Sequence, residues 1–85
     1  MTLRIETTSE GENLVFRLSG RIRSEELMEL KEQLEGITEK AVLDLKEVTL
    51  VDLEVVQFLG LCVTRGMELR NCAPYIRKWM EREKG

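Results

Sequence analysis

The chain lacks most of the side chains that enzymes use for acid–base and nucleophilic chemistry. Its 85 residues include no histidine, which excludes serine–histidine and cysteine–histidine nucleophiles. Neither a glycine-rich phosphate-binding loop nor a Gly-x-Ser-x-Gly motif is present. Asp52 and Glu54 are close in sequence, but they lie about 200° apart around a helix and would not converge on one reacting atom. We therefore expect a protein that is not an enzyme and binds no cofactor.

Cysteine, aromatic residues and long apolar runs are also scarce. Cys62 and Cys72 are the only cysteines and their spacing matches no zinc motif, so we expect packing residues and no metal site. Only 5% of the chain is aromatic, so the core must be mostly leucine, valine and isoleucine. No apolar run approaches the roughly 18 residues of a spanning helix, and the first residues do not resemble a secretory signal. We expect a cytoplasmic protein without membrane insertion.

The charge is distributed unevenly along the chain. The net charge of −3 combines −6 over residues 1–64 with +3 over residues 65–85. In the basic segment, however, lysine and arginine alternate with acids on an amphipathic helix. This arrangement favours a solvated helix face, and we expect no nucleic-acid partner.

Apolar periodicity predicts four strands in one domain spanning residues 1–85. Alternating residues at 2–6 and 14–18 predict a hairpin with a turn over 7–13, and Ser19-Gly20 ends its second strand. Two shorter runs predict two more strands, the apolar residues 41–45 and the mixed segment 67–71. Asp44 interrupts the first of these runs, so it is either a structurally satisfied acid or a functional one.

Three helices separate or follow these strands. Ser24 is predicted to cap a helix that reaches about residue 35, with a buried leucine stripe and Gly36 at its end. Asp52 is predicted to cap a helix over residues 53–65, and Pro74 to begin a third. The buried stripe comprises Leu27, Leu30 and Leu34. The apolar face of the second helix comprises Val55, Val56, Phe58, Leu59, Cys62 and Val63. That of the third comprises Tyr75, Ile76, Trp79 and Met80, with Trp79 either core or a binding anchor.

The predicted order is therefore β-β-α-β-α-β-α, an α/β fold with a four-stranded mixed sheet. We expect the long helices on one face and the other face partly open or used in association. Leu53 and Leu61 fall outside the apolar face of the second helix, with Gln57 between them, which indicates a possible contact ridge.

Several segments together resemble a STAS domain, the fold of bacterial anti-sigma factor antagonists and of modules in anion transporters and lipid-transport complexes. The family pattern is matched by Leu43-Asp44-Leu45, by Val51-Asp52 before a helix, and by the segment from Gly66 to Arg70. Gly20 matches the glycine that usually follows the second strand. The ending NCAPYIRKWMERE is similar to that of small bacterial STAS-like proteins.

One position departs from that pattern. The resemblance implies a phosphorylated serine after the loop aspartate, but Leu53 stands there, followed by Glu54 and Val55. Leucine cannot accept phosphate, so the usual switch cannot operate at this residue. Three explanations remain open: Glu54 imitates the phosphorylated state, the domain binds a partner constitutively, or the loop is only structural.

We favour a non-catalytic regulatory module that contacts an anti-sigma factor-like kinase or a complex subunit. The alternative is a scaffold or homodimer, for example a subunit of a lipid-transport complex, and a third class is small-ligand binding at the strand ends. Asp52 would hold the loop, the two leucines would supply apolar area, and the charged residues would steer the partner. The predicted contact residues are Asp52, Leu53, Glu54, Gln57, Leu61, Arg21 and Arg23.

Overall fold

The structure is a computed structural model that describes residues 3–37 and 40–84. The elements follow the predicted order: β1 (Leu3–Glu10), β2 (Asn13–Ile22), α1 (Ser24–Leu34), β3 (Lys40–Val51), α2 (Leu53–Thr64), β4 (Glu68–Arg70) and α3 (Pro74–Lys84). The strands lie side by side as β1-β2-β3-β4, with the first pair antiparallel and the other two pairs parallel. The predicted α/β fold with a four-stranded mixed sheet is therefore confirmed.

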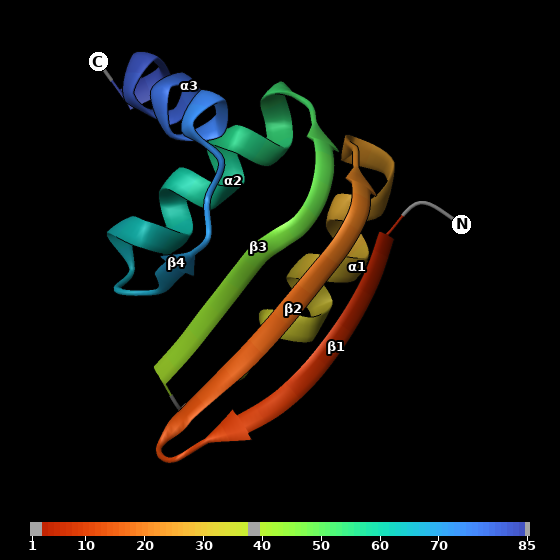
Figure 1. The fold of residues 1–85 in the computed structure, drawn as a ribbon, viewed down its shortest axis with the longest axis vertical. Coiled ribbons are helices and arrows are strands. Elements are labelled where there is room, and N and C mark those ends of the chain that lie inside the picture. The colour runs from red at the N-terminus through yellow and green to blue at the C-terminus, as the bar shows by residue number, and fades with distance from the viewer. Residues whose placement is uncertain (1–2, 38–39, 85) are drawn as a thin grey trace.

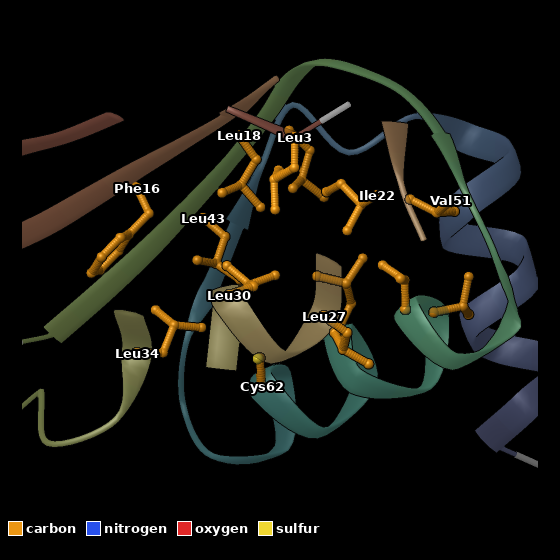
Figure 2. Packing of buried hydrophobic residues seen from close by; sticks show 14 of the residues in the cluster. Leu3, Phe16, Leu18, Ile22, Leu27, Leu30, Leu34, Leu43, Val51 and Cys62 are labelled. Carbon is orange, nitrogen blue, oxygen red and sulfur yellow. The ribbon is translucent and has the colours of Figure 1, made fainter. Parts of the chain in front are cut away.

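The core lies between the sheet and the helices α1 and α2, which cover the same face (Figure 1). Sheet residues such as Leu18 and Ile22 point toward Leu27 and Leu30 of α1, as Figure 2 shows. All three leucines of the predicted α1 stripe are buried. The third helix lies beside α2, on the β4 side of the sheet, and contributes Ile76 to the core. Trp79 packs against the core and is only partly buried.

The strands are longer than the apolar pattern predicts. The turn predicted over residues 7–13 is wrong in extent, because β1 continues to Glu10 and pairs with Asn13 across a two-residue turn. Residues 6–10 are exposed at the edge of the sheet, so this half of β1 needs no apolar side chains. Similarly, β3 continues from the predicted 41–45 segment to Val51. Only β4 is shorter than predicted, by one residue at each end.

Ser19-Gly20 does not end β2, contrary to the sequence prediction. The strand continues to Ile22 because its pairing with β3 shifts register twice, once on each side of Ser19 and Gly20. At each shift β3 contains one more residue than β2, as in a β-bulge. Gly20 adopts a φ of 87°, which glycine reaches without steric cost. With these two register shifts, the pairing of β2 with β3 continues to Ile22 and Val51, shortly before α1 and α2 begin.

The other face of the sheet is mostly polar, although it also includes two buried valines, Val15 and Val42. A cross-strand row of alternating charge runs over it, pairing Glu6 with Arg17, Arg17 with Asp44, and Asp44 with Arg70. Arg70 also makes ion pairs with Glu10 at 3.4 Å and with Glu68 at 3.9 Å. The expectation of a partly open face is confirmed.

Asp44 is the buried member of this row, with 7% of its surface exposed. Its Oδ1 accepts hydrogen bonds of 3.0 Å from the Lys46 N–H and from the Asn71 side-chain amide. Burial by itself raises the pKa of the carboxyl, but these bonds and the charges of Arg17 and Arg70 outweigh it and lower the pKa below its ordinary value of 3.8. Asp44 is thus structurally satisfied, which is one of the two interpretations the sequence left open.

Two apolar residues do not lie where the helical pattern places them. Val63 and Tyr75 are both exposed, although each was predicted on a buried face. Val63 lies at the border of the α2 apolar arc, where the sheet no longer covers it. Tyr75 lies in the first turn of α3, where Ile76 makes the core contact instead.

Candidate functional site

The carboxylate of Asp52 joins the starts of the two helices that cover the sheet. Its Oδ1 accepts the Val55 N–H at 3.2 Å, which makes Asp52 the predicted N-cap of α2. Its Oδ2 accepts the Ser24 N–H at 2.7 Å, the first amide of α1. Both amides are among the backbone N–H groups of a first helical turn, which have no hydrogen-bond partner within the helix. The positive end of the helix dipole also favours an anion there. One side chain therefore fixes the spacing of two loops at the carboxyl edge of the sheet.

The start of α1 differs from the prediction. Arg23, and not Ser24, is the N-cap residue, and Ser24 is the first residue of the helix. Glu26 Oε1 accepts the Arg23 N–H at 3.0 Å, so one half of a capping box is present. An arginine side chain has no acceptor, and the Ser24 amide is satisfied by Asp52. The cap thus comes from a residue 28 positions away, which no local pattern could reveal.

The structure brings five predicted contact residues together around this bridge. Arg23 and Leu53 directly adjoin the two residues joined by the Ser24–Asp52 bond, and Glu54 follows in the first turn of α2. Arg21 pairs with Leu50 in the β2–β3 register, one residue before the final pair of that ladder. Arg21, Arg23 and Glu54 are exposed, and Leu53 is 44% exposed.

The remaining two predicted residues lie further along α2. Gln57 is exposed, but its Nε2 donates to Glu83 Oε1 of α3 at 3.3 Å, so this side chain is shared with the neighbouring helix. Leu61 is 55% exposed, two turns beyond Leu53. We name the set the helix-start surface: Arg21, Arg23, Asp52, Leu53, Glu54, Gln57 and Leu61.

Leu50 was missed by the sequence reasoning. It is 45% exposed and lies opposite Arg21, which adds apolar area beside the helix-start surface. The pattern of the segment Val48–Val51 does not reveal it, because a register shift between Val48 and Leu50 interrupts the alternation and both Val48 and Val51 pack against the core. The strand was also predicted to end at residue 45.

Two grooves flank α2. One, of about 760 Å³, lies between α2, β4 and α3 and is lined by residues such as Val56, Gly60 and Met80. The other, of about 420 Å³, lies between α1 and α2 and includes Phe58 and Lys31. Lys31 Nζ is 5.8 Å from the centroid of the Phe58 ring, a cation–π contact that covers this ring. Leu61 lines both grooves and separates them.

The two cysteines show no sign of reactivity. Cys62 is buried in the core, and burial raises the pKa of its thiol to about 11, so the reactive thiolate is scarce at neutral pH. Burial also raises the pKa of the partly buried Cys72. Both are free thiols, in agreement with their prediction as packing residues.

Comparison with known proteins identifies the class of this fold. The sequence model of the family described as "Mlab, STAS domain" matches residues 5–82, nearly the whole chain. The chain belongs to this STAS domain family, as its sequence resemblance predicted. No match was found among curated proteins.

One solved structure supports the same fold. The crystal structure of an anti-sigma factor antagonist STAS domain from Rhodobacter sphaeroides is similar with a TM-score of 0.56 and 19% identity, covering 80% of each chain. An uncharacterised protein with a SpoIIAA-like fold from Shewanella loihica shows 22% identity and a TM-score of 0.44, covering 80% of this chain and 62% of that one.

Membership in the STAS domain family supports a regulatory or interaction module in general. Within the residues described by the structure, no helix is long and apolar enough to cross a membrane.

Proposed function

We propose that this chain is a regulatory protein-interaction module that binds its partner through the helix-start surface and does so without a phosphorylation switch at residue 53. The observation that carries the proposal is the fixed pair of helix starts at Asp52, with an exposed leucine directly after it. A surface whose geometry is set before binding loses less conformational entropy when the partner arrives. Leu53 and Leu61 supply apolar area, and Arg21, Arg23 and Glu54 supply charge at the rim.

The side chain at residue 53 distinguishes this proposal from an anti-sigma factor antagonist that is regulated by serine phosphorylation. A phosphorylated serine would add about −1.5 to −2 charges at the start of α2. Leu53 offers no hydroxyl, and the single charge of Glu54 is a weak substitute. The partner, an anti-sigma factor-like kinase or a complex subunit, would therefore be held constitutively.

The test begins with identification of the partner. A photo-cross-linking amino acid is introduced at position 53, and the cross-linked partner is identified by mass spectrometry from the organism that encodes the chain. The expected result is one protein partner whose capture is lost when the same amino acid is placed at Met28, an exposed α1 residue outside the helix-start surface. Capture that is equally efficient from both positions would contradict the proposal, as would phosphate within residues 49–54.

A second candidate function is self-association as a scaffold, and the outer edge of β1 favours it. In the part of the chain that the structure describes, no strand pairs with this edge. An antiparallel pair of β1 strands centred on Thr7 would place Arg4 opposite Glu10 of the second copy, a favourable cross-strand pair. Charged residues on an edge strand also protect it from pairing, which is why we rank this function second.

Light scattering across a concentration series separates the two. A constant monomer mass up to high concentration would remove the scaffold function. A dimer that is lost in the Arg4→Glu variant and regained when Glu10→Arg is added would support it, because only paired charges give such a rescue.

A further inference from the structure

The groove between α2 and α3 contains a glycine that the fold itself does not explain. Gly60 lies in the middle of α2, where glycine destabilises a helix relative to alanine. A Cβ built at this position meets no other atom within 4 Å, so no close packing inside the described chain requires glycine here. The space above its backbone is part of the 760 Å³ groove. A close approach by something outside the chain would account for it.

The walls of the groove are apolar and adaptable. Val56 and Val63 line it from α2, Met67 and Leu69 from the β4 segment, and Met80 from α3. Val63 is exposed although it belongs to the apolar side of its helix. Methionine side chains adapt to irregular apolar partners. The volume is suited to several apolar side chains presented together.

The rim of the groove is acidic. Of the four charged side chains that line it, Glu68, Glu81 and Glu83 are acidic and Arg77 is basic, and Glu68 also makes the 3.9 Å ion pair with Arg70. Glu83 is held in place by the 3.3 Å bond from Gln57. A bound segment that carries lysine or arginine beside its apolar residues would match this charge, whereas an acidic segment would be repelled.

We propose that this groove binds a basic amphipathic helix of a partner protein, packed against the backbone of α2 at Gly60. The segment from Val56 to Thr64 is about 13 Å long, so two to three turns of the bound helix would fill the groove. Its apolar residues at i, i+3, i+4 and i+7 would enter between α2 and α3. This site shares Gln57 and Leu61 with the helix-start surface but does not include Asp52 or Leu53.

The probe for the test is a fluorescein-labelled synthetic peptide of 18 residues, with leucine at helical spacing and lysine on the flanks. One control peptide has glutamate in place of lysine, and another has the same composition without helical periodicity. Binding is measured by fluorescence anisotropy, and the site is mapped by amide chemical shifts. We expect at least tenfold weaker binding for both control peptides and shift changes centred on Gly60, Val63 and Met80.

Two substitutions at one position separate folding from binding. Gly60→Ala adds only a Cβ into open space and should raise the Tm by roughly 2–8 °C. Gly60→Leu fills the groove and should weaken peptide binding at least tenfold while the variant remains folded. Met28→Lys removes an exposed apolar side chain outside the groove and should leave peptide binding unchanged.

Several outcomes would overturn the proposal. These are no binding of the basic peptide, equal binding of the scrambled peptide, or an unchanged affinity in Gly60→Leu. If shift changes lie at Arg23 and Leu53 instead, the groove proposal fails while the proposed function stands. A change of oligomeric mass in Gly60→Leu would assign the groove to a second copy of this chain.

Discussion

Asp44 illustrates how a single buried acid can contribute to the fold of a domain. Its carboxylate accepts the Lys46 N–H at the first register shift of β3 and holds Asn71 after β4. Asn71 has a φ of 59°, a conformation that asparagine tolerates better than most residues. The chain turns there toward α3, so Asp44 links the middle of the sheet to the final helix.

The lowered pKa of Asp44 predicts a pH dependence of stability. Because its folded-state pKa lies below 3.8, Asp44 stabilises the protein above about pH 4, and this contribution is lost as the pH falls through the folded-state value. Both of its hydrogen bonds are accepted by Oδ1. In Asp44→Asn the side-chain carbonyl oxygen can accept the same two bonds, so this substitution removes mainly the negative charge. We expect Asp44→Asn to lower the free energy of unfolding by about 1 kcal/mol at pH 7.

Urea unfolding of the wild type and Asp44→Asn at pH 7, 5 and 3 measures this effect. The difference between the two proteins should persist at pH 5 and shrink toward pH 3. A difference that is the same at all three pH values would show that the charge of Asp44 does not contribute to stability.

Among the elements, the starts of α1 and α2 depend on one another through Asp52. Asp52→Ala removes the acceptors for both Val55 and Ser24, and we expect a loss of about 1–2 kcal/mol in the free energy of unfolding. Asp52→Ser can still cap α2, but its shorter side chain cannot bridge to α1. It should therefore cost less than the alanine variant.

Amide hydrogen exchange measured by NMR distinguishes the two roles of Asp52. The Ser24 amide should exchange faster in both variants, whereas the Val55 amide should exchange faster only in Asp52→Ala. Protection of Ser24 that persists in Asp52→Ser would contradict the bridge between the helix starts.

The same elements show what local sequence can and cannot predict. Leu27, Leu30 and Leu34 predicted α1 correctly because burial of one helix face has a fixed period. Asp52 was predicted as a cap because capping is local. The full lengths of β1 and β3 were not predicted, because exposed edge residues and bulges carry no apolar alternation. The Asp52–Ser24 and Gln57–Glu83 bonds join residues more than 25 positions apart, which no pattern in a single sequence specifies.

In the whole molecule, the two faces of the sheet have different roles. One face is covered by α1 and α2 and supplies the core, while the other carries a row of alternating charges beside the buried Val15 and Val42. Among the described residues, the exposed large apolar side chains lie on the three helices and at the carboxyl edge of the sheet: Met28, Leu50, Leu53, Leu61, Val63 and Tyr75. This distribution supports the proposal that a protein partner binds on the helix side of the molecule.

Family membership agrees with the fold, and Leu53 is the residue on which the proposed absence of a phosphorylation switch rests. With leucine at this position, the partner cannot be released by phosphorylation there. The account therefore predicts constitutive binding in which Leu53 is a direct contact.

The most direct test of this claim uses isothermal titration calorimetry with the purified partner that the cross-linking experiment identifies. It compares the affinity of that partner for the wild type, for Leu53→Asp and for Met28→Asp. The account predicts at least a tenfold loss of affinity for Leu53→Asp, because a carboxylate replaces a leucine in the contact, and little change for Met28→Asp. Both variants should keep the stability of the wild type, since both side chains are exposed. Equal affinity of Leu53→Asp and the wild type would contradict the account.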